Sequence, residues 1–156
     1  MDWFIRGPCS AIILAISATT ALATGTIACV VEDKVLSLSL NAPFAIGRGD
    51  ALLDVTGKIG IKFDGTPRDL GPVNLERQSV AQYWFQGRDL RFYVVQDKDA
   101  GDKAVTVTVL LDVKRVRTDP TTYRGHYVLE ARHRDRTTTG AGIMQKASGY
   151  AECSAD

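Results

Sequence analysis

The two histidines are the residues best suited to act as an acid, a base or a metal ligand near neutral pH. His133 stands on the apolar side of an expected strand, near Tyr83 and Gln145 of other strands. His126 lies an odd number of residues away, on the opposite side, so the two cannot share a metal ion there. Neither has Asp, Glu or Cys at ligand spacing. We therefore expect no metal and no cofactor, and predict an interior ligand-binding site lined by Tyr83, Tyr127, His133 and Gln145.

The segment "DKDAGDK", residues 97–103, carries three carboxylates around a glycine. Calcium loops of the EF-hand type place glycine after the third acidic ligand, whereas here Gly101 precedes Asp102. Asp and Gly are also common turn residues, so the segment is predicted to be a hairpin loop. No G-x-S-x-G, H-E-x-x-H, P-loop or CxxC motif occurs. An enzyme is therefore disfavoured, and a small hydrolase using His133 is the least favoured function.

A second set of candidate residues faces outward from the expected sheet. The predicted registers place Trp84, Arg91 and Arg132 in one row across the strands, with Arg134 in the next row. A tryptophan beside arginines can form cation–π contacts with them or offer its ring to a ligand. Trp84, Arg91, Arg132 and Arg134 are therefore predicted to recognise a macromolecule. The alternative is an ordinary solvated face.

The N-terminal residues have the features of a secretory signal. The uncharged run "SAIILAISATTALA", residues 10–23, is shorter than the ~20 residues that span a bilayer. It ends in Ala21-Leu22-Ala23, a small-x-small pattern that a signal peptidase accepts. We predict that residues 1–23 are a cleaved signal peptide and that the protein is periplasmic or secreted. The alternative is a buried N-terminal helix.

Three cysteines bear on the same question. Cleavage after Ala23 removes Cys9 and leaves Cys29 and Cys153 near the two ends of the mature chain. Exported proteins with two cysteines commonly pair them, so a Cys29–Cys153 disulfide is expected. The alternatives are that Cys29, in "TIAC", carries a lipid or is a buried thiol. Cα atoms more than ~7 Å apart would exclude the disulfide.

Apolar and polar residues alternate with period two through much of residues 24–156, and helical periodicity is missing. In "KAVTVTVLLDVKRVR", residues 103–117, the valines at odd positions share one face. Residues 30–40 and 51–63 alternate in the same way. Residues 64–79 are rich in Gly and Pro and are expected to form a loop with one helical turn.

Turn residues predict how the strands pair. Gly87-Arg88 suits a two-residue type II′ turn, which places Phe85 opposite Leu90, Tyr83 opposite Phe92 and Ala81 opposite Val94. The later loops are predicted to place Leu90 opposite Val109, Val109 opposite Ala131, Ile143 opposite His133 and Ala147 opposite Leu129. One predicted inner row therefore contains Tyr83, Phe92, Val107, His133 and Ile143. Aromatic residues beside Gly125 and Gly149 are expected to cover those glycines.

These observations predict an all-β domain, residues 24–156, formed by an antiparallel meander of seven or eight strands. Closing the sheet into a small barrel, or folding it into a two-sheet sandwich, removes exposed edges. In a closed meander, the first strand can meet the last in antiparallel pairing only if the strand count is even. A Cys29–Cys153 bond therefore favours eight crossings or a sandwich.

The function predicted from the sequence is that of an exported, non-catalytic binding protein. It would carry a small amphiphilic ligand in a barrel or recognise an envelope or extracellular macromolecule on its sheet face. The alternative is a secreted inhibitor or envelope interaction protein that acts through loops such as residues 64–79. The formal net charge of +1 gives no reason to expect a nucleic acid or an anionic membrane as partner.

Overall fold

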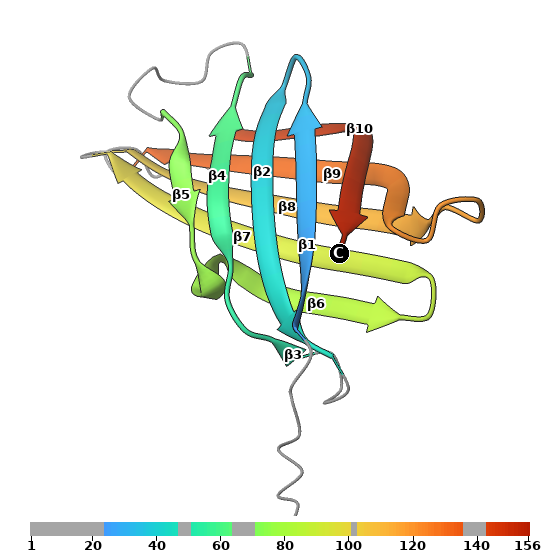
Figure 1. Ribbon diagram of the computed structural model, residues 1–156. Coiled ribbons are helices and arrows are strands. Elements are labelled where there is room, and N and C mark those ends of the chain that lie inside the picture. Colours follow the sequence, from blue (N-terminus) through green and yellow to red (C-terminus); the bar gives the residue numbers. More distant parts are fainter. Residues whose placement is uncertain (1–23, 47–50, 64–70, 101–102, 136–142) are drawn as a thin grey trace, which may run out of the picture.

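The protein is seen here as a computed structural model that describes residues 24–46, 51–63, 71–100, 103–135 and 143–156 (Figure 1). The predicted signal peptide, residues 1–23, lies outside the described residues. The fold is all-β, as predicted, and the described residues form ten strands where seven or eight were predicted. The strands are β1 (Thr24–Glu32), β2 (Leu36–Ala45), β3 (Ala51–Leu52), β4 (Thr56–Ile61), β5 (Val73–Leu75), β6 (Val80–Gln86), β7 (Asp89–Ala100), β8 (Lys103–Arg115), β9 (Thr122–Asp135) and β10 (Ile143–Ala155).

All ten strands belong to one antiparallel sheet. Its order is β5-β4-β2-β1-β10-β9-β8-β7-β6, and β3 pairs with β2 beside this path. Figure 1 shows the sheet folded over itself, with β5, β4, β2 and β1 crossing in front of β9, β8, β7 and β6. Strand β10 bends from one layer into the other and joins them. The side chains between the two layers form the core.

The two edges of the sheet are consecutive in the chain. Strand β5 is followed by a 3₁₀ turn, η1 (Arg77–Ser79), and then by β6. Strands β5 and β6, joined by η1, can therefore be counted as one interrupted strand that crosses the sheet once. They do not pair with each other within the described residues. Counted this way, and leaving out the two-residue β3, the ten strands make eight crossings. That even number agrees with the antiparallel pairing of β1 with β10.

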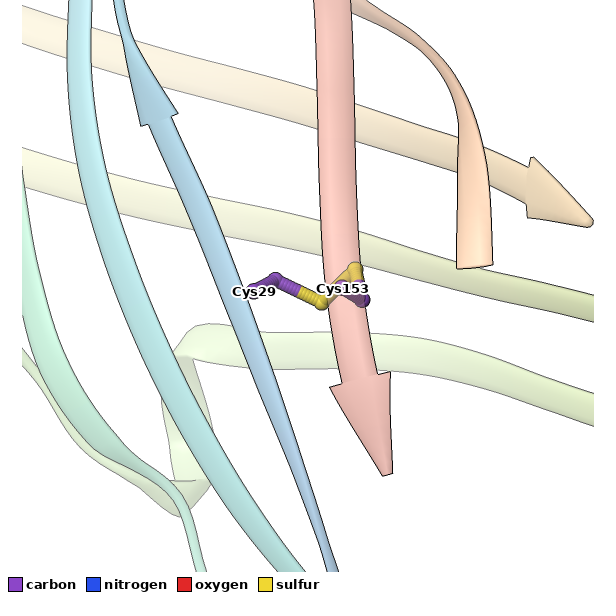
Figure 2. Close-up of a disulfide and its surroundings, with 2 residues drawn as sticks. All are labelled: Cys29 and Cys153. Carbon is purple, nitrogen blue, oxygen red and sulfur yellow. A yellow bond between two sulfur atoms is a disulfide. The ribbon is translucent and has the colours of Figure 1, made fainter. Parts of the chain in front are cut away.

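The predicted disulfide is present in the structure. Cys29 and Cys153 are directly opposite each other on β1 and β10, with Cα atoms 4.0 Å apart and the sulfurs bonded (Figure 2). Both side chains are buried in the core. Cys29 is therefore paired, as expected from the cysteine count, and is not a free thiol.

Two predicted registers are confirmed. Phe85 pairs with Leu90 and Tyr83 with Phe92 across the Gly87-Arg88 turn, where Gly87 has a φ of 61°. Ile143 pairs with His133 and Ala147 with Leu129, also as predicted. The predicted pair of Ala81 with Val94 is wrong, because a bulge between Val80 and Gln82 brings Val80 opposite Val94.

The registers on both sides of β8 differ from the prediction. Leu90 pairs with Val113 rather than Val109, because β7 continues through Asp97 and Asp99 in the predicted loop. Val109 pairs with Leu129 rather than Ala131. Both shifts are even, so every side chain stays on its predicted face.

The turn between β8 and β9 explains the second difference. Asp119 Oδ1 accepts hydrogen bonds from the backbone N–H of Thr121 at 3.0 Å and from its hydroxyl at 2.7 Å. Asp119 Oδ2 accepts one from the Thr122 hydroxyl at 2.6 Å. These bonds, led by the one from Thr122, lower the pKa of Asp119 to about 2. The turn is therefore centred on Asp119, one residue before the centre at Pro120 that the predicted pair of Val109 with Ala131 implies.

The inner face of the sheet forms one apolar core. Its largest fully buried side chains are Tyr123, Tyr127, Phe92, Leu36, Leu38, Leu40, Leu90, Leu111, Leu129, Val55, Val94 and Val109. The odd-numbered residues of β8 from Val105 to Val113 are all buried, as their alternation predicted. In the described part of the predicted loop, residues 71–79, the helical turn is confirmed as η1, whereas the short strand β5 was not predicted.

Candidate functional site

The four predicted interior residues do not form one site. Tyr83 and Tyr127 belong to one row across the sheet, in which Phe92 and Leu111 lie between them. His133 lies six residues beyond Tyr127 on β9, about 20 Å away at the rise of an extended strand. The predicted row that contained Tyr83 and His133 is therefore wrong, because the β7–β8 and β8–β9 registers are shifted.

Tyr127 closes one end of the core through a contact that the sequence analysis missed. Its side chain is fully buried, and its hydroxyl donates a 2.5 Å hydrogen bond to Asp33 Oδ2 in the turn between β1 and β2. Asp33 Oδ1 in turn accepts the backbone N–H groups of Val35 and Leu36 at 2.8 and 2.9 Å. The sequence predicted one alternating run over residues 30–40, but β1 ends at Glu32 and β2 begins at Leu36, so the turn that contains Asp33 was missed.

Gly149 makes room for the pair of Tyr127 and Asp33. It lies opposite Tyr127, and a Cβ placed on it would come within 2.6 Å of Tyr127 Cε1 and 2.7 Å of Asp33 Oδ2. This confirms the prediction that a tyrosine covers this strand glycine. The tyrosine is therefore a packed and bonded part of the core rather than a free wall of a cavity.

The electrostatics of this contact favour a neutral tyrosine and a charged aspartate. Burial raises the pKa of Tyr127 above its ordinary value, and the hydrogen bond to Asp33 raises it further. Burial also acts to raise the pKa of Asp33, but the hydrogen bonds from Tyr127, Val35 and Leu36 outweigh it. The pKa of Asp33 is therefore below its ordinary value.

Replacing Tyr127 with phenylalanine should destabilise the fold by about 2 kcal/mol, because the partly buried carboxylate of Asp33 loses a hydrogen bond. The pKa of Asp33 should also rise, which carboxyl NMR titration would detect. A carboxyl whose pKa is lowered by folding stabilises the protein above its unfolded pKa and loses this contribution as the pH falls. The loss of stability on acidification should therefore be smaller in Tyr127→Phe than in the wild-type protein.

Tyr93→Phe is the control, because the Tyr93 hydroxyl has no hydrogen bond within the described chain. Equal stability of the two variants would contradict the prediction.

The other interior candidates make short-range polar contacts. His133 Nε2 and Gln145 Oε1 lie 3.2 Å apart, so the tautomer protonated at Nε2 donates to Gln145. Among the described residues, no carboxylate or hydroxyl forms a hydrogen bond with His133. The Tyr83 hydroxyl accepts the backbone N–H of Leu52 at 3.1 Å. These contacts do not assemble an acid–base pair.

Two interior spaces lined by described residues are small. One, between β4, β5, β7 and β8 beside Ile59 and Val107, measures about 20 Å³. Another, beside Phe44 and Phe85, measures about 10 Å³. A space of this size holds about one water molecule, whereas ligand pockets usually measure a few hundred Å³. Neither space is lined by Tyr127 or His133.

The four residues predicted to form one outer recognition surface lie in two separate places on the sheet. Trp84 lies opposite Arg91, as predicted, and Arg91 Nε forms an ion pair with Asp112 Oδ2 at 3.2 Å. Arg132 instead pairs with Thr106 and Met144, and Arg134 with Ala104. The row that contains Trp84 crosses β9 at His126, six residues and so about 20 Å from Arg132.

The structure brings other apolar side chains beside Trp84. Together with Trp84 on β6, they lie in two adjacent rows on the outer face, with one residue each from β7, β8, β9 and β10. We call this set the apolar band: Trp84, Tyr93, Leu110, Val128 and Tyr150.

The apolar band is partly open to solvent. Trp84, Val128 and Tyr150 expose 45%, 36% and 58% of their surface, and Tyr93 and Leu110 are half-buried. Neighbouring side chains on one face of a sheet are about 5 to 8 Å apart, so the band is continuous across five strands. The alternation in the sequence shows that each of these residues faces outward. Only the register of the strands shows that they lie side by side.

The charges beside the apolar band compensate one another. Arg91 pairs with Asp112, and Lys146 with Glu130. Arg124 Nε pairs with Glu152 Oε2 at 2.9 Å, and the Tyr150 hydroxyl donates to the same oxygen at 3.0 Å. The band is therefore flanked by local ion pairs rather than by a surface of one sign.

The described chain contains neither a cluster of metal ligands nor a membrane-spanning helix. No group of three or more His, Cys, Asp or Glu residues there could hold a metal ion. No helix in that part of the molecule is long and apolar enough to cross a membrane. The buried disulfide is of a kind that forms and persists in an oxidising environment.

Comparisons with known proteins do not assign a family. No family model matches the chain, and neither a curated protein nor a solved structure matches it. The class that the fold and the surface define is a disulfide-linked, antiparallel β-protein with an apolar band on its outer face.

Proposed function

We propose that this protein is an exported, non-catalytic binding protein that recognises another protein through the apolar band. The observation that carries the proposal is the exposure of aromatic and aliphatic side chains side by side on five strands. Protein interfaces are enriched in aromatic residues, and contiguous exposed apolar patches mark interaction sites. A partner that covers the band removes this surface from water.

Two further observations support a protein partner. The ion pairs beside the band leave no surplus charge that would attract a polyanion such as a nucleic acid. The interior spaces beside Ile59 and Phe44 are too small for an amphiphilic ligand, so recognition on the sheet face is favoured over carriage in the core. Export is supported by the disulfide and by the signal-like N-terminal sequence.

Site-specific photocrosslinking in the natural host tests this proposal. A photoreactive phenylalanine is placed at Val128, in the middle of the band, or at Ser39, an exposed residue on the other layer. We expect a crosslinked adduct from position 128 and none from position 39. The adduct should be lost when Trp84→Ala and Tyr150→Ala are added, while the thermal melt of the purified variant stays near that of the parent.

Two outcomes would overturn the proposal. One is the absence of an adduct at position 128, and the other is an adduct that persists without Trp84 and Tyr150. Export is tested separately by the intact mass of the protein recovered from its compartment. Cleavage after Ala23 predicts a mature chain that begins at Thr24.

A further inference from the structure

The outer edge of β6 is open within the described residues. Strand β6 pairs with β7 on one side only, and no described strand pairs with its other side. The opposite edge of the sheet, β5, is only three residues long. Natural proteins protect long edges with charge, proline, bulges or covering segments. In β6 the bulge protects only the start, between Val80 and Gln82.

Backbone groups at this edge lack partners in the sheet. The two residues that flank a two-residue hairpin turn, here Gln86 and Asp89, exchange hydrogen bonds, and the pairs then alternate along the strands. Trp84 is therefore bonded to β7, whereas the N–H and C=O groups of Tyr83 and Phe85 point away from it. No hydrogen bond to these four groups is found within the described chain.

An open surface hollow lies over β6 and the turn η1. Its volume is about 300 Å³, and it is lined by Arg77, Val80, Ala81, Gln82, Tyr83 and Trp84. The guanidinium of Arg77 lies over the Tyr83 ring, 5.7 Å from the ring centroid. A strand added to β6 would therefore find free backbone groups at Tyr83 and Phe85, and open space beside Tyr83.

We propose that the occupant of this edge is β6 of a second copy, so that the two sheets join across a two-fold axis. In such an isologous contact, residues near the axis meet their own copies. A charge there would face the same charge, but the sequence of β6, VAQYWFQ, contains none. An unrelated partner strand would impose no such condition, so the lack of charge favours self-pairing.

One register satisfies the geometry best. Antiparallel pairing centred on Trp84 places Tyr83 of each copy opposite Phe85 of the other, so these residues exchange hydrogen bonds on both sides of the axis. The two Trp84 rings then face each other on the outer face, and Gln82 faces Gln86. Cross-strand aromatic pairs of this kind are favourable. The dimer would join the two apolar bands end to end, because Trp84 is the last residue of each.

A change of charge at Trp84 tests the dimer. Trp84 is an outward-facing, partly exposed residue, so Trp84→Lys leaves the core intact. We expect the purified mature protein to sediment as a dimer and Trp84→Lys to weaken dimerisation by about 100-fold or more, because two lysines face each other at the axis. Mixing Trp84→Lys with Trp84→Glu should restore a dimer that neither forms alone. Tyr150→Lys, at an exposed residue far from β6, is the control and should leave the mass unchanged.

A wild-type protein that stays monomeric at hundreds of micromolar overturns the inference. So does an unchanged dimer of Trp84→Lys, or a mixture of the two charged variants that stays monomeric. These measurements use purified protein alone. Their failure would therefore leave the proposed recognition of another protein, which is tested at Val128 in the host, unaffected.

Discussion

Reducing the Cys29–Cys153 disulfide is expected to lower the free energy of unfolding by roughly 4 to 5 kcal/mol. The two cysteines are 124 residues apart in sequence, so the bond closes a loop that includes almost the whole domain. In the chain-entropy treatment, the stabilisation grows with the logarithm of loop length, because a longer free chain loses more conformations when its ends are tied. The bond also joins β1 to β10, the seam between the N-terminal and C-terminal strands. Its loss should therefore affect the whole fold rather than one hairpin.

Denaturant unfolding with and without a reductant measures this effect. The double variant Cys29→Ala/Cys153→Ala is the control, because reductant should not change its midpoint. Each single variant should be about as unstable as the double variant, since either one removes the same bond. An oxidised protein that unfolds at the same denaturant concentration as the reduced protein would show that the bond contributes little to stability.

Replacing Gly125 with alanine should cost about 3 kcal/mol or more. Gly125 lies opposite Val113, and a Cβ placed on it would be 2.1 Å from the Asp112 carbonyl oxygen and 2.8 Å from Val113 Cα. Both contacts are with backbone, which cannot rotate away as a side chain can. Strands β8 and β9 would have to separate near the start of β9, where Figure 1 shows a sharp bend. Overpacking that displaces backbone is among the most destabilising of single substitutions.

Gly60→Ala provides the matched control. A Cβ on Gly60 in β4 would have Pro72 Cγ as its nearest neighbour at 3.7 Å, which is ordinary contact. We expect this substitution to change stability by less than about 1 kcal/mol, because it also restricts the unfolded chain. Thermal unfolding of the two variants side by side measures the difference. Equal melting temperatures for Gly125→Ala and Gly60→Ala would contradict the prediction.

Local pattern was sufficient to predict the faces of the strands. Alternation with period two depends only on neighbouring residues, so Val105 and Val109 were assigned to the core from β8 alone. The turn at Gly87-Arg88 is equally local, and it predicted the pairs of Tyr83 with Phe92 and Phe85 with Leu90. The number of strands was not predictable in this way, because β3 and β5 are too short to show alternation.

The registers around β8 required information that composition does not contain. Residues 97–102, with three aspartates and one glycine, resemble a loop in sequence, yet Asp97 and Asp99 continue β7 and pair with Thr106 and Ala104. Asp97 Oδ1 accepts a hydrogen bond from the Thr106 hydroxyl at 2.6 Å, a cross-strand contact that exists only in this register. Turn residues are compatible with several loop lengths, and the choice is made by pairing along the whole strand.

The sequence by itself determined which residues face inward, which residues form the Gly87-Arg88 turn and which two cysteines pair. These properties follow from periodicity, local turn geometry and counting. Only the tertiary structure decided that Asp33 meets Tyr127, 94 residues away, that His133 and Tyr83 are separated, and that five strands align their outward apolar side chains in one band. The reason is physical. A side chain stays on the same face of the sheet when the register shifts by an even number of residues. A site, however, requires particular side chains to meet, and each shift of two residues moves them almost 7 Å apart.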